Sequence, residues 1–192
     1  MVGAPPRSSN VRKHTSGNPV QRVLLARFHA TVGDLVGEAL HMQAGCLRSQ
    51  DVLDVGCGEG FVARALDLQV IGLDHRAEVR PVLLGNAGHL PVRDSVFPVV
   101  LCLEVLEHLP EPWLAIEEMR RVCAGYLILS GPDQPWFSLG NFMRGKNLSR
   151  LGEDPEHLWH WRGGTFLRLL GERCEVVRVV RSFPWVIALA KA

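Results

Sequence analysis

Three side chains in the segment "LCLEVLEHLPEP" have the types and spacing of a cation site. Glu104, Glu107 and His108 stand at i, i+3 and i+4, so a single helical turn would place them on one face. Two carboxylates and an imidazole that point the same way offer the oxygen and nitrogen ligands that divalent cations take. Further along, "DPEHLWHWRGGTF" supplies His157 and His160, and either can complete the set.

Each of these side chains also has a simpler interpretation. His108 can cap the turn and Glu107 can face solvent, with no metal bound. His157 or His160 is then a candidate general base, because the pKa of an imidazole lies near neutral pH. A further alternative needs no base, since holding an acceptor in line with a strong electrophile supplies much of the rate.

Aromatic side chains gather in two segments that can reach the same site. The first segment holds Asp133, Gln134, Trp136 and Phe137, and the second holds Trp159 and Trp161. They can line a pocket for a planar or lipophilic substrate, with Asp133 among the candidate catalytic groups. Covering the core from above is an equally good explanation of the aromatic residues.

A second constellation begins in "DVLDVGCGEG", where Gly56, Gly58 and Gly60 alternate behind an apolar run. Glycine lets the main chain turn sharply or approach a ligand closely, because it has no Cβ. The spacing G-x-G-x-G differs from the G-x-G-x-x-G of dinucleotide-binding loops. Fourteen residues beyond Gly60, Asp74 can accept both hydroxyls of a ribose, and Asn86 follows in "GNAGHLP".

The elements that position these residues follow from the hydrophobic pattern. Short apolar runs predict seven strands that are buried on both faces, at residues 51–55, 70–74, 82–86, 98–104, 125–130, 175–182 and 185–191. Helical periodicity predicts helices between most of them, and one long amphipathic helix at 19–42. We therefore predict an α/β, doubly wound, mostly parallel sheet that ends in an antiparallel β-hairpin. The seven residues 75–81 are too few for a helical crossover, so the connection between strands two and three is shortened.

Composition fits a globular chain with one domain. The 192 residues are 47% hydrophobic and 21% charged, with a net charge of +1, so bulk charge gives no attraction to nucleic acid. The five cysteines lie mostly in apolar runs, which favours reduced thiols and a cytoplasmic location. No apolar run reaches the roughly 18 residues of a membrane span. We expect a flexible arm at 1–17 and a single domain at 18–192.

Taken together, the glycine loop, Asp74, Asn86 and the closing hairpin resemble the class I methyltransferases that use S-adenosyl-L-methionine (SAM). Within that class they look like the methyltransferase type 11, or ubiquinone-menaquinone methyltransferase-like, group. The resemblance runs from about Val52 to Ala192. It implies a Rossmann-like fold, SAM as the cofactor, and transfer of a methyl group.

The resemblance also implies which residues contact SAM, from its amino-acid end to its adenine. They are Asp54, Gly56, Gly58 and Gly60 at the amino-acid end, Leu103 and Glu104 beside the methionine moiety, Asp74 at the ribose, and Asn86 and Ala87 at the adenine. Asn86 departs from the family, which most often has Asp there. The shortened connection would leave the ribose and adenine less covered, and we expect the arm at 1–17 to fold over the cofactor.

The E-x-x-E-H turn is similar to that of two families of metal-assisted O-methyltransferases. One methylates catechol-type intermediates of ubiquinone synthesis, and the other methylates the terminal ribose of small RNAs. This resemblance implies Mg²⁺ or Mn²⁺ held by Glu104, Glu107, His108 and His157. Such an ion would lower the pKa of the acceptor's hydroxyl and fix its position.

The sequence therefore predicts SAM-dependent methylation of a small molecule, at oxygen. One alternative is 2′-O-methylation of the ribose at RNA ends, which the net charge of +1 does not favour. Others are a SAM-binding protein with little catalysis and an NAD-dependent oxidoreductase, the latter disfavoured by the glycine spacing.

Overall fold

The chain forms a seven-stranded sheet in the order β3-β2-β1-β4-β5-β7-β6. The computed structural model describes residues 17–43, 52–76, 82–134, 136, 138, 157–161 and 164–192, so most of the expected N-terminal arm lies outside the described residues. The strands are β1 (Val52–Val55), β2 (Ile71–Asp74), β3 (Leu83–Leu84), β4 (Phe97–Leu103), β5 (Cys123–Pro132), β6 (Glu175–Ser182) and β7 (Trp185–Lys191). The helices are α2 (Pro19–Met42), α3 (Phe61–Ala65), the 3-10 turn η2 (Leu106–His108), α4 (Pro112–Val122) and α6 (Thr165–Gly171).

Strand direction follows from the lengths of the connections. Strands β1 to β5 pair in parallel, and β7 runs antiparallel between β5 and β6. Phe183 and Pro184 alone separate β6 from β7, which is too short for a crossover, so the chain must reverse as a hairpin. The predicted doubly wound sheet with a terminal antiparallel hairpin is confirmed.

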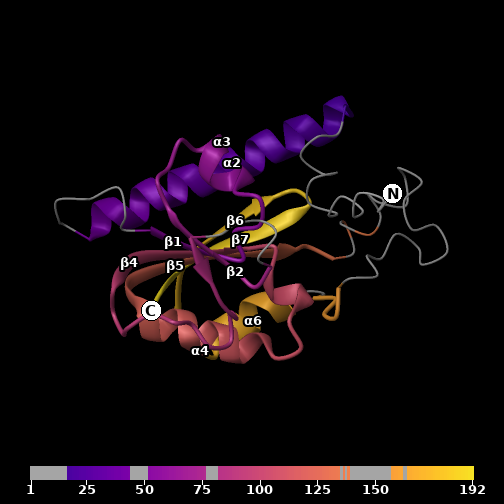
Figure 1. Cartoon of the computed structure of the whole chain (residues 1–192). Coiled ribbons are helices and arrows are strands. Elements are labelled where there is room, and N and C mark those ends of the chain that lie inside the picture. The colour runs from indigo at the N-terminus through magenta and orange to yellow at the C-terminus, as the bar shows by residue number, and fades with distance from the viewer. Residues whose placement is uncertain are drawn as a thin grey trace, which may run out of the picture.

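The helices cover both faces of the sheet. Figure 1 shows α2 and α3 on one face and α4 and α6 on the other. Side chains of β4 alternate between the two layers, because successive residues of a strand point to opposite faces. Leu101 and Leu103 pack with the α2 side, whereas Val100 and Cys102 pack with the α4 side. This two-sided burial explains why β1, β4, β5 and β7 are nearly continuous apolar runs. The prediction that all seven strands are buried is wrong for β6, which lies at the edge of the sheet and is mostly exposed.

Helix α2 begins and ends where its sequence predicts. The Asn18 side chain caps it by accepting the backbone N–H of Val20 at 2.9 Å, and Pro19 occupies the first turn. The apolar stripe is buried only from Phe28 onward, since Val20 remains 61% exposed. Among the helices of the described ranges, none combines the length and apolar character that crossing a membrane requires.

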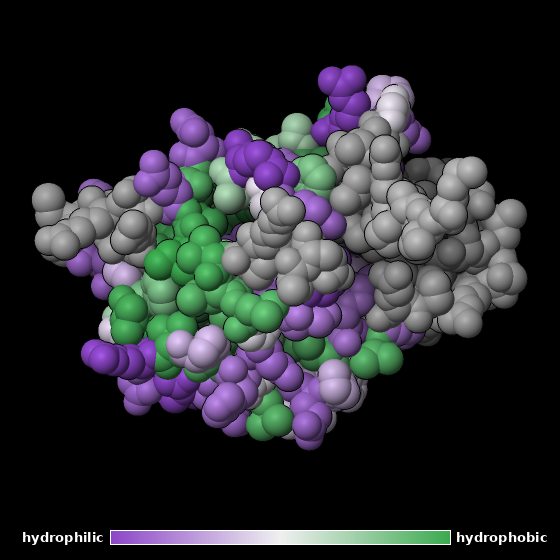
Figure 2. Space-filling view, in the orientation of Figure 1, coloured by the Kyte–Doolittle hydropathy of each residue, from purple (hydrophilic) through white to green (hydrophobic). Residues whose placement is uncertain are grey.

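The short strand β3 forms one edge of the sheet. Val82 beside it is 71% exposed and Leu84 within it is 59% exposed. Figure 2 shows apolar surface on the face that is turned to the viewer, over this side of the sheet. The stretch 77–81, where we expect a shortened connection, lies outside the described residues.

Candidate functional site

The glycine loop leaves the carboxyl end of β1 and is held against β2. The N–H groups of Gly56 and Cys57 donate to the carbonyl oxygen of Leu73 at 2.7 and 3.0 Å. Gly56 has a φ of +77°, and a Cβ at this position would collide with the side chain of Val105. Only glycine therefore fits here, and no side chain at this position covers the main chain of the loop.

Two buried carboxylates stand on either side of the loop. Asp54 and Asp74 are each 3% exposed. Burial, and then the charge of Asp74, raises the pKa of Asp54 to about 7. Burial also acts to raise the pKa of Asp74, but hydrogen bonds from Arg76 and from the Gly58 amide outweigh it and hold this pKa below its ordinary value.

A hollow of about 540 Å³, its open mouth included, lies at the carboxyl ends of β1 and β4. Its walls come from α2, the glycine loop, α3 and the starts or ends of three strands. The lining residues are Leu25, Phe28, Asp54, Gly56, Cys57, Phe61, Val62, Leu103, Glu104 and Trp185. Open α/β sheets bind their ligands at this edge. The lining joins an apolar wall to two carboxylates.

Glu104 is fixed in the wall of this pocket by its neighbours. Its carboxylate accepts the indole N–H of Trp185 at 2.6 Å and the hydroxyl of Ser130 at 3.1 Å. Its backbone N–H donates to the same Ser130 oxygen at 3.1 Å, and its φ of +58° is unusual for a residue other than glycine. The Trp185 ring packs on Phe28 with the ring centroids 5.0 Å apart.

The pocket also contains a thiol, that of Cys57. Burial, followed by the charges of Asp54 and Asp74, raises the pKa of this thiol to about 12. Cys57 packs so closely on β2 that a Cβ at Gly72 would lie 2.8 Å from its sulfur.

A second cluster lies just beyond β4. Glu107, His108 and His157 each offer a ligand atom, and these atoms lie within 4.8 Å of one another. The backbone carbonyl of Glu107 accepts the N–H of Leu158 at 2.8 Å, which holds the histidine segment against η2. The ring of His160 lies 6.3 Å from that of His157, measured between centroids.

Glu104 does not belong to this cluster, although its spacing predicts that it would. The helical turn begins at Leu106 rather than at Glu104, because Glu104 adopts a left-handed conformation at the end of β4. Its carboxylate is consequently turned to Trp185. The expected shared face thus forms for Glu107 and His108, with His157 as the third member.

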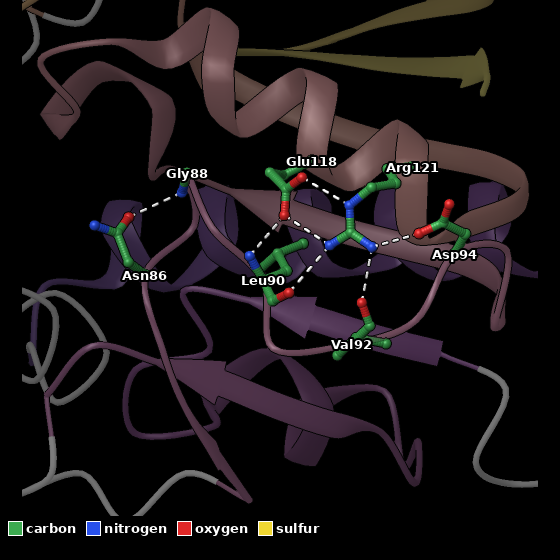
Figure 3. Close-up of polar contacts among 7 residues, drawn as sticks. All are labelled: Asn86, Gly88, Leu90, Val92, Asp94, Glu118 and Arg121. Carbon is green, nitrogen blue, oxygen red and sulfur yellow. Dashed lines mark hydrogen bonds and ion pairs between the residues drawn. The ribbon is translucent and has the colours of Figure 1, made fainter.

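Asn86 and Ala87 lie on the loop after β3, beyond the lining of the pocket. The side-chain oxygen of Asn86 accepts the N–H of Gly88 at 2.8 Å, which orders this turn, and Ala87 is 8% exposed. Figure 3 shows the rest of the loop tied to α4 by Arg121. Its guanidinium donates to the carbonyls of Leu90 and Val92 at 3.0 and 2.8 Å.

Glu118 completes this attachment of the loop. It accepts the Leu90 N–H at 2.8 Å and the Arg121 Nε–H at 2.7 Å (Figure 3). Chiefly because of the bond from Arg121, the pKa of Glu118 falls to about 2. An ionised pair therefore fixes the loop that carries Asn86.

The aromatic residues predicted to line a pocket for the acceptor do not line the hollow described above. Trp161 is 7% exposed and packs on Phe166, with ring centroids 5.1 Å apart, so it belongs to the core. Trp159 packs on Trp113, and Trp136 is 50% exposed. Asp133 uses its backbone N–H to bind the carbonyl of Pro184 at 2.9 Å, and Phe137 lies outside the described residues.

Sequence patterns did not single out Phe28 or Trp185 as lining residues. Phe28 lies within the apolar stripe of α2, where core packing is the ordinary expectation. Trp185 is the first residue of β7 and pairs with Pro132 at the end of β5. Because β7 is antiparallel, its first residue lies at the same edge as the carboxyl ends of the parallel strands. This topological signal was present in the predicted hairpin.

Comparisons with known proteins agree with this arrangement. Residues 53–129 match the family described as "Methyltransferase domain". A probable S-adenosylmethionine-dependent methyltransferase of Mycobacterium tuberculosis is 35% identical over 107 residues, which are 48% of this chain and 39% of that protein. The chain thus spans about two fifths of the length of that relative.

Two further proteins are similar over longer stretches. The ubiquinone biosynthesis O-methyltransferase of Serratia proteamaculans is 30% identical over 149 residues, 60% of each chain. Magnesium protoporphyrin IX methyltransferase of Synechocystis superimposes with a TM-score of 0.63 at 19% identity, covering 94% of this chain and 91% of that one. The last likeness concerns the fold alone.

Proposed function

Because the chain carries a class I, SAM-dependent methyltransferase domain, we propose that it transfers a methyl group from SAM to an oxygen of a small molecule. The observation that carries the proposal is the pocket at the carboxyl ends of β1 and β4, where the glycine loop meets Asp54 and Glu104. The similarity to ubiquinone biosynthesis O-methyltransferases supports oxygen as the acceptor atom.

The residues of the pocket fit this cofactor. SAM bears a positively charged ammonium and a sulfonium, and the pocket presents two carboxylates, those of Asp54 and Glu104. The absence of a Cβ at Gly56 leaves the loop open to close approach. The apolar side chains of Phe28, Leu103 and Trp185 complete walls suited to the uncharged parts of the ligand.

Each residue that the sequence resemblance assigns to SAM then has a role that its position supports. Asp54 binds the ammonium, and Glu104, held by Trp185 and Ser130, faces the methionine moiety. Asp74 binds the ribose, and Asn86 with Ala87 orders the loop on the adenine side. When bound, SAM supplies an electrophilic methyl group. The chain holds the acceptor in line with that group and keeps water away from it.

For activation of the acceptor we propose a divalent cation, Mg²⁺ or Mn²⁺, at Glu107, His108 and His157. The gathering of one carboxylate and two imidazoles supports it, because this donor set suits hard to borderline cations. A cation there would lower the pKa of a nearby hydroxyl. Without a cation, His157 or His160 is the candidate base that accepts the proton of the acceptor.

Binding of S-adenosylhomocysteine (SAH) tests the cofactor assignment. We expect calorimetry to detect SAH binding that Asp54→Asn weakens at least tenfold. The matched control is Asp34→Asn, which removes an exposed carboxylate from α2 and leaves the affinity unchanged. Binding of NAD in place of SAH would refute the proposal.

The acceptor and the cation are tested together in a methyl-transfer screen. Catechols, quinol precursors, glycosides and short RNA are offered with and without Mg²⁺ or Mn²⁺. We expect activity on a small hydroxylated acceptor that EDTA removes and that Glu107→Gln lowers strongly. The control is Glu117→Gln, an exposed carboxylate of α4. Activity that survives EDTA unchanged would refute the cation and favour a histidine base.

A further inference from the structure

The carboxylate that faces the ribose site is fully engaged within the chain. Asp74 Oδ1 accepts the backbone N–H of Arg76 at 2.9 Å and its Nε–H at 3.1 Å. Asp74 Oδ2 accepts the Gly58 N–H at 2.9 Å and Nη2 of Arg76 at 3.3 Å. A carboxylate has about four acceptor positions. Two of the four are therefore taken by one movable side chain.

A ribose that binds through both hydroxyls needs two of these positions. The backbone donors of Gly58 and Arg76 are fixed by the loop, whereas the guanidinium sits on a flexible stem. Asp74 is 3% exposed as it stands, so a nucleoside cannot reach it without displacing a donor. His75 Nδ1 also lies near Asp74 Oδ1, at 3.4 Å, but its side chain is 78% exposed and does not cover the carboxylate. The guanidinium, which bonds to both carboxylate oxygens, is therefore the group that must leave.

We propose that Arg76 is a displaceable latch on the ribose site, whose guanidinium covers Asp74 until a nucleoside with both ribose hydroxyls replaces it. The inference rests on the proposed function, because it assumes that Asp74 receives a ribose. The latch makes cofactor affinity depend on the fraction of molecules in which Asp74 is uncovered. Arg76 is in this sense a residue that sets affinity and selects ligands with an intact ribose.

A second carboxylate, that of Glu59, is an alternative ion-pair partner for the displaced guanidinium. Arg76 Nη1 lies 4.0 Å from Oε1 of Glu59, which belongs to the glycine loop. The Arg76 side chain is 27% exposed and that of Glu59 is 22% exposed, so both can rearrange at the surface. Exchange from Asp74 to Glu59 keeps the guanidinium paired while the ribose site opens.

The test measures the affinity of SAH for the full chain and for Arg76→Gln. We expect Arg76→Gln to bind SAH about tenfold more tightly, as for a latch closed in about nine tenths of the molecules. The probe for the ribose is the 2′,3′-dideoxy analogue of SAH, whose affinity should be the same for both proteins. Arg120→Gln, which removes an exposed charge from α4, is the matched control and should change neither affinity.

Glu59 provides an independent arm of the same experiment. Glu59→Gln should weaken SAH binding severalfold in the parent chain and leave it unchanged in the Arg76→Gln background, since no latch remains there. NMR of the Arg76 Nε–H should show its signal move away from that of the Asp74-bound guanidinium as SAH saturates the protein.

The possible results distinguish a failure of the latch proposal from a failure of the proposed methyltransferase function. Weaker SAH binding by Arg76→Gln, or an equal gain for the dideoxy analogue, overturns the latch and leaves the proposed function intact. An Nε–H signal that stays in place at saturation does the same. If none of the proteins binds SAH, the proposed function is wrong and the latch falls with it.

Discussion

Replacing Asp54 by asparagine should make the protein more stable and a poorer binder of its cofactor. Asp54 is buried, and its pKa in the folded chain is about 7 against an ordinary value of 3.8. The folded state therefore holds this proton more tightly than the unfolded state does. Between these two pKa values the folded chain binds more protons, so the free energy of unfolding falls as pH rises.

The size of the effect follows from the two pKa values. The full difference corresponds to about 4 kcal/mol of destabilisation above pH 7, of which about 2.5 kcal/mol develops between pH 5 and pH 8. Asparagine resembles the protonated carboxyl in shape and cannot ionise. The stability of Asp54→Asn should then exceed that of the parent chain, and this advantage should grow by about 2.5 kcal/mol from pH 5 to pH 8.

Urea denaturation at several pH values, followed by tryptophan fluorescence, measures this difference. Across this pH range Asp74 stays ionised and Cys57 stays protonated in both proteins, so the comparison isolates the titration of Asp54. Asp34→Asn controls for the loss of one charge at an exposed site. The reasoning is refuted if Asp54→Asn is less stable than the parent chain at pH 8, or if its advantage does not change with pH.

Three further predictions concern the same pocket. Affinity for SAH, measured by calorimetry, should fall about fivefold from pH 7 to pH 6, because Asp54 must lose its proton to pair with the ammonium. Gly56→Ala should lower the free energy of unfolding, measured in urea, by about 2 kcal/mol or more, because the backbone is strained and the new Cβ collides with Val105. The control is Gly37→Ala in α2, where the Cβ enters open space, and it should raise the free energy of unfolding by up to about 1 kcal/mol. Trp185→Phe keeps a ring but deprives Glu104 of its donor, which should cost about 2 kcal/mol in the same assay. A cost below about 0.5 kcal/mol would show that this bond is dispensable.

The fold was predictable because its signals are local and repeated. The runs that become β6 and β7 were bounded correctly: β7 is buried along almost its whole length and is apolar throughout, whereas the edge strand β6 is mostly exposed and mixes valines with charged residues. The two residues between these strands permit only a hairpin. Helix α2 likewise begins at Pro19 and ends at Met42, as its cap and periodicity predict.

The site was less predictable because its details depend on contacts between distant segments. Spacing places Glu104 with Glu107, but it does not reveal that Glu104 takes a left-handed conformation and bonds to Trp185, 81 positions away. Apolar periodicity predicts that Val20 is buried, yet Val20 is 61% exposed and the neighbouring polar residue Gln21 is buried. The contact of the Arg76 guanidinium with Asp74 joins residues only two positions apart, but it depends on a side-chain conformation that the sequence pattern does not specify.

The Cys57 thiol in the pocket bears on the resistance of the protein to methylation by its own cofactor. A thiolate beside an electrophilic methyl donor is itself a potential methyl acceptor. The thiolate is the reactive species, and a pKa of about 12 keeps Cys57 protonated at neutral pH. Asp54 and Asp74 contribute to that shift. The carboxylates proposed to recognise the cofactor thus also protect the pocket from it.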